Sequence, residues 1–244
     1  MRQFRCTACG GIMAALRGIL FDKDGTLFDF HATWSRWSAD LVFSLANGSI
    51  DKAGDLARAI GFDLATRRFH PGSPVIAGTP PEIAEALLPH LPGRGLGDLV
   101  AQMNGLAAEA RMAPAVPLTR LLQALRRRGL RLGLATNDGE RPARAHLASV
   151  GIADLFDYIA GSDSGHGGKP HPGMLLAFAA AERLAPHQVA MVGDSTHDLI
   201  AGRAAGMATV AVLTGPAGAE ELAPLADVVL PDIGHLPDWL DSRT

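Results

Sequence analysis

Two carboxylates stand one residue apart in the stretch Asp22–Thr26 (DKDGT), directly after the short apolar run Gly18–Phe21 (GILF). A run of this length is too short for a helix and is typical of a buried strand. At the tip of such a strand, Asp22 could bind a divalent cation and attack phosphorus, and Asp24 could protonate a leaving oxygen. An Asp-Gly turn that merely ends a strand is the alternative interpretation.

Two further groups of polar residues lie beside predicted strands and helices. Thr136 and Asn137 directly follow the apolar run 130–135, where a hydroxyl and backbone N–H groups could hold a phosphoryl oxygen. A strand-ending turn with Asn as a helix cap is the alternative. Lys169 is one of three lysines in the chain and precedes Pro170 just before a predicted helix. Its charge could offset that of a phosphoryl group.

A second acidic pair lies in the segment Gly193–Asp198 (GDSTHD), after another apolar run. Asp194 could ligate a metal, and Asp198 stands four residues later. A turn followed by a helix cap would explain the same residues without a metal. Ligation by Asp22, Asp194 and the carbonyl oxygen of Asp24 would use oxygen atoms alone, which suits magnesium rather than zinc.

Predicted strands and helices alternate through the second half of the chain. The spacing of apolar residues predicts helices over 118–128, 141–150, 172–183 and 198–205, and strands over 130–135, 158–160, 189–192, 209–213 and 228–230. Continuous apolar strands between helices indicate a parallel sheet covered on both faces. The predicted fold class is therefore α/β, with a doubly wound, Rossmann-like parallel sheet, whose ligands bind outside the carboxyl ends of the strands.

Residues 30–114 break this alternation. They hold no convincing strand, and their apolar residues recur at helical spacing, as between Trp34 and Leu45. We therefore expect a helical domain inserted after the first strand, connected through Phe28–Phe30 and Met112–Pro117. The expected division is a core domain of residues 1–29 and 115–244 and a cap domain of residues 30–114.

Composition narrows the functional class. The chain has 244 residues, 48% of them hydrophobic, which is enough for a core domain and a smaller one. The net charge of -3 gives no basic excess for nucleic acid or an anionic membrane, and no apolar run approaches the ~20 residues that span a bilayer. Cys6 and Cys9 do not complete a zinc site. We expect them to be unpaired thiols in a loose tail over residues 1–12, Met13 to be the natural start, and the protein to be cytoplasmic.

Taken together and in this order, four segments resemble the four motifs of the haloacid dehalogenase superfamily. The segments are Asp22–Thr26, Thr136-Asn137, Lys169-Pro170 and Gly193–Asp198. The resemblance covers about residues 19–230, and the helical insert is similar to the C1-type cap of that superfamily. Within it, the chain most resembles the phosphoglycolate phosphatase-like hydrolases.

The resemblance implies a magnesium-dependent phosphatase that hydrolyses a small phosphorylated metabolite through an aspartyl-phosphate. It assigns Asp22 as the nucleophile and Asp24 as the acid and base. It assigns Thr136, Asn137 and Lys169 to phosphate binding, and Lys169 also to charge neutralisation in catalysis. The ligands of Mg²⁺ would be Asp22, Asp24 and Asp194. Asp198 would support the metal and orient the lysine. The cap is expected to close over the substrate.

Several alternatives remain open at this stage. A phosphomutase would share both aspartates of the first motif, and a receiver-like phospho-acceptor or an inactive binding module would be no enzyme at all. In the insert, Arg67 and Arg68 could grip a substrate carboxylate such as that of phosphoglycolate, or lie on a solvated face. His31 and Trp34 could touch the substrate, or Trp34 could belong to the core of the cap. The sequence predicts no oligomeric state.

Overall fold

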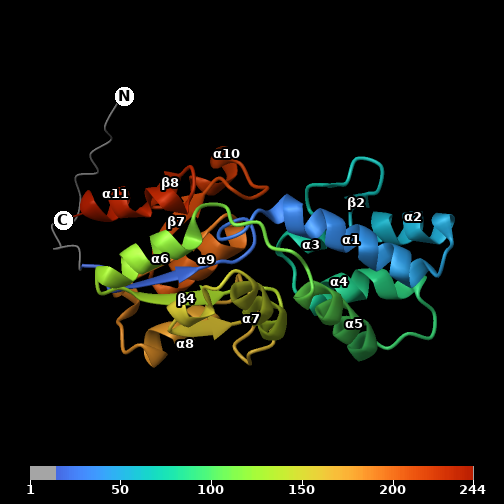
Figure 1. Cartoon of the computed structure of the whole chain (residues 1–244), viewed down its shortest axis with the longest axis horizontal. Helices are drawn as coiled ribbons and strands as arrows, with labels where there is room; N and C mark the ends of the chain where they lie inside the picture. The colour runs from blue at the N-terminus through green and yellow to red at the C-terminus, as the bar shows by residue number, and fades with distance from the viewer. Residues whose placement is uncertain (1–14, 244) are drawn as a thin grey trace.

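The computed structural model describes residues 15–243 of the chain, so the predictions for Cys6, Cys9, Met13 and the N-terminal tail lie outside the described residues (Figure 1). A six-stranded sheet has the order β5-β4-β1-β6-β7-β8, and every neighbouring pair is parallel. The strands are β1 Gly18–Phe21, β4 Arg131–Ala135, β5 Tyr158–Ala160, β6 Val189–Gly193, β7 Ala208–Val212 and β8 Val228–Leu230. The predicted doubly wound α/β core is confirmed.

Helices follow the strands along the chain, close to the predicted ranges. They are α6 Leu118–Arg127, α7 Glu140–Ser149, α8 Gly173–Ala181, α9 Thr196–Ala205, α10 Ala219–Leu222 and α11 Leu236–Asp241, with short 3-10 helices at Ala153–Leu155, Pro186–Gln188 and Ile233–His235. The start of α9 was predicted two residues too late. Ser195 caps this helix through its side chain, which accepts from the N–H of Asp198, so Asp198 lies in the first turn instead of opening the helix.

Both faces of the sheet are buried under helices. In β1, Ile19 and Phe21 pack into one apolar cluster, whereas Leu20 packs into a cluster on the opposite face. Helices α6, α7 and α11 complete the first cluster, and α8 and α9 complete the second; α11 and α8 can be seen on opposite sides of the sheet in Figure 1. Parallel strands buried on both faces need apolar residues throughout, which explains the continuous runs in the sequence.

The insert after β1 is mainly helical and has its own apolar cluster, drawn entirely from residues between Phe30 and Ala107. Its helices are α1 Phe30–Ala46, α2 Ile50–Ala59, α3 Pro74–Ala77, α4 Pro80–Leu87 and α5 Leu96–Ala108, with a 3-10 helix at Leu88–His90. In Figure 1 these helices lie together at one end of the molecule. The division into a core domain (1–29 and 115–244) and a cap domain (30–114) stays a prediction.

The expectation that the insert holds no strand was wrong. Strand β2 Phe62–Asp63 pairs antiparallel with β3 Arg68–Phe69. The carboxylate of Asp63 accepts from the N–H groups of Ala65 and Thr66, which closes the turn between the strands. Two residues per strand are too few to display an alternating pattern, so this hairpin has no periodic signal in the sequence.

The two connections between sheet and insert lie side by side. Phe28 forms an antiparallel bridge with Pro114, the N–H of Asp29 donates to the carbonyl of Ala113 at 2.8 Å, and the N–H of Ala115 donates to the carbonyl of Leu27 at 2.9 Å. The insert is thus held to the sheet by a short two-stranded strap. Across residues 15–243, no helix combines the length and the apolar character needed to cross a membrane.

Candidate active site

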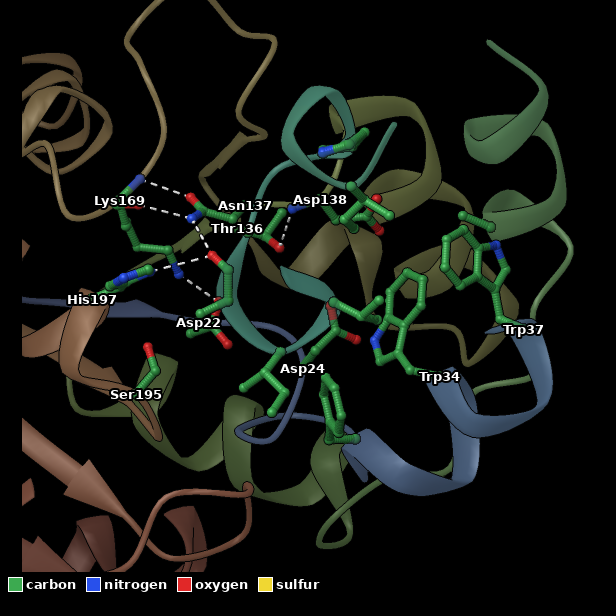
Figure 2. A pocket seen from close by; sticks show the side chains of 18 of the residues that line it. Asp22, Asp24, Trp34, Trp37, Thr136, Asn137, Asp138, Lys169, Ser195 and His197 are labelled. Carbon is green, nitrogen blue, oxygen red and sulfur yellow. Dashed lines mark hydrogen bonds and ion pairs between the residues drawn. The ribbon is translucent and has the colours of Figure 1, made fainter. Parts of the chain in front are cut away.

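The four predicted motifs meet at the carboxyl ends of the central strands. Strands β1 and β4 end at Phe21 and Ala135, directly before two of the motifs, and β6 ends at Gly193, the first residue of a third. One pocket between the sheet and the insert is lined by six of the seven predicted site residues, namely Asp22, Asp24, Thr136, Asn137, Lys169 and Asp194. Figure 2 shows the first five of these side chains converging from separate elements, with the two tryptophans of α1 on one side. Asp198, the seventh, lies buried behind Lys169.

Asp198 positions the lysine beside Asp22. The ammonium of Lys169 lies 2.5 Å from Oδ1 of Asp22 and 2.6 Å from Oδ1 of Asp198. The other oxygen of Asp198 accepts from the backbone N–H of Ser195 at 3.1 Å and from its hydroxyl at 2.6 Å. Burial alone would lower the pKa of Lys169, but Asp198 and Asp22 outweigh burial and raise it. Lys169 therefore stays charged, at a fixed place, next to Asp22.

Three buried carboxylates crowd together at this point. Asp22, Asp194 and Asp198 each offer an oxygen, and the three atoms lie within 4.8 Å of one another. Burial raises the pKa of Asp22 to about 7, an effect that Lys169 opposes and Asp198 reinforces. Burial, together with the charges of Asp22 and Asp198, raises the pKa of Asp194 well above its ordinary value. Such a cluster is stabilised in its ionised form by a cation.

The donor set fits a hard cation. It consists of carboxylate oxygens, without a histidine or cysteine among them, and Mg²⁺ prefers oxygen ligands. Because both oxygens of Asp198 already bind Lys169 or Ser195, Asp22 and Asp194 are the carboxylates best placed for a metal. Oδ1 of Asp194 accepts from the hydroxyl of Thr26 at 3.1 Å, which fixes its orientation.

Two glycines enclose Asp194: Gly25, in the Asp-Gly turn of the first motif, and Gly215, which the sequence analysis did not single out. Gly25 has a φ of +84°, and a Cβ atom at Gly25 or at Gly215 would overlap the carboxylate of Asp194. The hydroxyl of Thr214 donates to the carbonyl of Gly25 at 2.6 Å, so the loop after β7 braces the first motif. Nothing in the local sequence of that loop indicated that it would reach the site, because the contact depends on the order of the strands.

Thr136 and Asn137 differ in how free their side chains are. The hydroxyl oxygen of Thr136 accepts from the N–H of Asp138 at 3.1 Å, which leaves its hydrogen available for donation. The amide of Asn137 accepts from the N–H of Lys169 at 2.7 Å and donates to the carbonyls of Lys169 and Ala77. Asn137 therefore ties the lysine and the insert to the sheet, and its contact with phosphate stays a prediction.

A buried cation lies between the two acids of the first motif, and the sequence analysis assigned it no role. Lys23 is fully buried. Its ammonium lies 2.6 Å from Asp24 and 3.1 Å from Asp138, and 5.3 Å from the centre of the Trp34 ring. Burial alone would lower the pKa of Lys23, but the two carboxylates outweigh burial and raise it. A lysine flanked by two aspartates was a visible signal, whereas its partners Asp138 and Trp34 were not.

His146 continues this network into the insert. Its Nδ1 lies 2.9 Å from the ammonium of Lys23, and its Nε2 lies 2.6 Å from the carbonyl oxygen of Ala107 in α5. Because an ammonium can only donate and a carbonyl can only accept, the ring is neutral with its proton on Nε2. Burial, and secondly the charge of Lys23, lowers the pKa of His146 to about 4.

The insert contributes a wall that contains no cation. Trp34 packs in the apolar cluster of the insert and also lines the pocket, and its contact with the substrate stays a prediction. His31 is absent from the pocket wall and packs against Phe30 and Phe69. Arg67 and Arg68 are exposed at the hairpin, and among residues 15–243 no arginine lines the pocket. Both arginines thus lie outside the pocket, which favours the solvated-face alternative over a grip on a substrate carboxylate.

Residues 16–206 match the family described as haloacid dehalogenase-like hydrolase. This span is most of the chain, and the chain therefore belongs to the haloacid dehalogenase-like hydrolase family.

Similar proteins with known names indicate which kind of hydrolase within this family the chain resembles. The phosphoglycolate phosphatase of Escherichia coli (strain K12) is 31% identical over 218 residues, which cover 82% of each chain. The phosphoglycolate phosphatase of Rhodospirillum rubrum is 40% identical over 121 residues, which span 49% of this chain and 50% of that one. These matches mark the chain as a phosphatase of the phosphoglycolate phosphatase type.

Solved structures share the fold. A β-phosphoglucomutase from Clostridium difficile superposes with a TM-score of 0.68 over 93% of this chain and 96% of that chain, at 18% identity. At this identity the likeness shows the common fold alone, and it does not decide between hydrolysis and phosphoryl transfer to another acceptor.

Proposed function

We propose that the protein is a magnesium-dependent phosphatase that hydrolyses a small phosphate monoester through a phospho-aspartate on Asp22. The observation that carries this proposal is the convergence of Asp22, Asp24, Thr136, Lys169 and Asp194 on one pocket. These groups supply a nucleophile, an acid, a hydroxyl donor, a cation and a metal ligand. The cytoplasmic location predicted from cysteine usage remains a prediction.

The first half-reaction transfers the phosphoryl group to the protein. A carboxylate oxygen of Asp22 attacks phosphorus while the bond from phosphorus to the leaving oxygen breaks. Asp24 donates its proton to that oxygen. Asp24 lines the pocket, and its Oδ2 is held by Lys23. Its Oδ1 is buried and has no hydrogen-bond partner within residues 15–243. This free oxygen is the one suited to proton transfer.

The second half-reaction returns the protein to its starting state. A water molecule gives a proton to Asp24 and attacks phosphorus, and the bond from phosphorus to Asp22 breaks to release inorganic phosphate. Lys169 and the hydroxyl of Thr136 hold the phosphoryl oxygens in both steps. Asp22, Asp194 and the carbonyl of Asp24 would hold Mg²⁺, which when bound neutralises charge on the phosphoryl oxygens.

The test is release of inorganic phosphate from a panel of phosphate monoesters with magnesium. We expect Asp22→Asn to lower the rate at least about a thousandfold while the protein stays folded, because the amide keeps the shape but lacks the nucleophilic oxygen. EDTA should abolish wild-type activity and magnesium should restore it. Wild-type activity retained by Asp22→Asn would remove Asp22 as the nucleophile. Transfer of the phosphoryl group to a second alcohol, without free phosphate, would identify a mutase instead.

A further inference from the structure

The pocket has two chemically different halves. The half that receives the phosphoryl group comes from the sheet and carries all the charged groups that line the pocket. The half that receives the leaving group comes from the insert and is apolar, formed among others by Phe30, Trp34, Trp37, Pro80, Ile83 and Met103. Among the described residues, the polar groups that the insert adds to this wall are neutral: the amide of Asn104 and the indole N–H groups of the two tryptophans. The N–H of Trp37 is buried without a hydrogen-bond partner among residues 15–243.

The charges of the pocket disfavour an anionic leaving group. Among the described residues Lys169 is the only lysine that lines it, and this cation is already paired with Asp22 and Asp198. Two carboxylates, Asp24 and Asp138, also line the pocket. Their ion-pair partner Lys23 is fully buried and is not part of the lining, although its ammonium lies 5.3 Å from the centre of the Trp34 ring. A carboxylate placed here would lose its hydration and, among the side chains of the insert that line the pocket, would find neutral N–H donors but no cation.

Two indoles dominate the apolar wall. Trp34 and Trp37 stand one turn apart on α1, with ring centres 5.0 Å apart at an interplanar angle of 81°. Figure 2 shows Trp34 next to Asp24 and Trp37 farther from the sheet. Asp24 is the group that protonates the leaving oxygen, so the atoms attached to that oxygen must lie against these rings. Aromatic walls of this kind bind apolar bodies by burial and by ring contacts.

From this geometry, and resting on the proposed phosphatase function, we infer that the preferred substrate is the phosphate monoester of an uncharged, apolar alcohol. Its aliphatic or aromatic body packs against Trp34 and Trp37, and a substrate whose leaving group carries a carboxylate, such as phosphoglycolate, is disfavoured. This inference concerns only how the leaving group is recognised. The roles proposed for the residues that bind the phosphoryl group stay the same.

The experiment compares kcat/KM for ethyl, propyl and butyl phosphate with that for phosphoglycolate, with saturating magnesium. The alkyl esters have leaving alcohols of similar acidity, so differences among them report binding. We expect kcat/KM to rise about three- to fourfold with each methylene group until the wall is covered. Phosphoglycolate should fall more than about tenfold below ethyl phosphate. Better hydrolysis of phosphoglycolate than of all the alkyl esters would overturn the inference and leave the phosphatase function intact.

Two variants of α1 test whether the preference for longer alkyl esters comes from the tryptophan wall. Trp37→Ala should reduce the ratio of kcat/KM between butyl and ethyl phosphate to near one, whereas Phe43→Ala, at a residue of α1 that is 53% exposed, should leave the ratio unchanged. Equal ratios in both variants and the wild type would overturn the assignment to this wall.

A second pair of variants avoids the removal of a large buried side chain, which Trp37→Ala requires. Asn104 is half-buried, and Asn104→Lys adds a cation beside the leaving group, whereas Asn104→Gln adds length without charge. We expect Asn104→Lys to raise kcat/KM for phosphoglycolate relative to ethyl phosphate about fivefold or more, and Asn104→Gln not to. No gain in Asn104→Lys would contradict the placement of the leaving group. Absence of any phosphate release by the wild type, matching Asp22→Asn, would instead overturn the proposed function.

Discussion

Lys23 balances the charges of the first motif from inside the protein. Four carboxylates line the pocket, and Lys169 is engaged by Asp22 and Asp198. Lys23 supplies a second buried cation, paired with Asp24 and Asp138. Removing one member of such a buried network leaves an uncompensated charge, which costs about 3–5 kcal/mol. The residue between the two aspartates is thus part of the electrostatic design of the site.

His146 should make stability depend on pH in a defined window. The unfolded chain binds a proton on this ring near pH 6.5, whereas the folded protein does so only near its pKa of about 4. Between these values the unfolded state holds more protons, so the free energy of unfolding falls as the pH falls, by about 3 kcal/mol in all. His146→Gln keeps an acceptor for Lys23 and a donor for Ala107, and should lack this component.

The measurement is urea unfolding of wild type and His146→Gln at pH values from 8 to 4. Above about pH 7 the difference between the two free energies of unfolding should be constant, which provides an internal control. Below that pH the wild type should lose stability relative to the variant. A difference that stays constant down to pH 4 would show that the ring is not held neutral by its surroundings.

Elements and their ends were the part of the molecule that the sequence could predict. Apolar runs bounded by Asp22, Thr136 and Asp194 marked three strand ends, and parallel packing brings such ends to one edge. The partners of Lys23 were out of reach, because His146 is 123 positions away in the chain and meets it only through the packing of α7. The contact between Gly215 and Asp194 could not be predicted either, because it follows from the order of β6 and β7 in the sheet.

Asp157 stands directly before β5 and joins it to β4 and α6. Its carboxylate accepts from the N–H of Leu132 in β4 at 2.9 Å, from Arg126 in α6 at 2.9 Å and from Arg131 at 3.2 Å. Burial alone would raise the pKa of Asp157, but these hydrogen bonds outweigh burial and lower it. The carboxylate therefore stabilises the fold at neutral pH, and this contribution is lost as the pH falls through the lowered pKa of the folded state.

Asp157→Asn should lower the free energy of unfolding by about 1–3 kcal/mol at pH 7, because charged hydrogen bonds become neutral and one donor of the amide has no acceptor. The deficit should narrow below about pH 4, where the carboxyl group of the unfolded wild type is protonated. Asp40→Asn removes an exposed carboxylate of α1 and should change stability by less than about 1 kcal/mol. Equal effects of the two substitutions in urea unfolding would argue against Asp157 as a joint between elements.

At the scale of the whole molecule, three side chains of the core contact backbone carbonyls of the insert. The carbonyl of Ala77 accepts from Asn137 at 2.7 Å and lies 3.3 Å from Nδ1 of His197, and that of Ala107 accepts from His146. Because these contacts use the backbone of the insert, its side chains remain available to the substrate. The position of the insert can thus be fixed by the sheet while its side chains set the shape and polarity of the wall.

Metal binding should be visible in the stability of the whole chain, independently of catalysis. Asp22 and Asp194 are buried close together, and burial raises the pKa of both. A cation that binds only the folded state stabilises it by about 2.7 kcal/mol at a concentration one hundred times its Kd. For a chain of this size that corresponds to a rise in Tm of roughly 5–10 °C. Magnesium should therefore raise the Tm of the wild type, and EDTA should reverse the rise.

Asp194→Asn distinguishes the role of this carboxylate in metal binding from its effect on the stability of the fold. In EDTA this variant should be at least as stable as the wild type, because the substitution removes one of three crowded, buried carboxylates and thereby relieves like-charge repulsion and desolvation. On addition of magnesium its Tm should stay nearly constant, because a hard cation has lost an anionic ligand. Thermal unfolding of both proteins with and without magnesium measures the two effects together. If magnesium raised the Tm of the variant as much as that of the wild type, Asp194 would be excluded as a ligand. If the variant were much less stable than the wild type in EDTA, the charge of Asp194 would serve the fold rather than the metal.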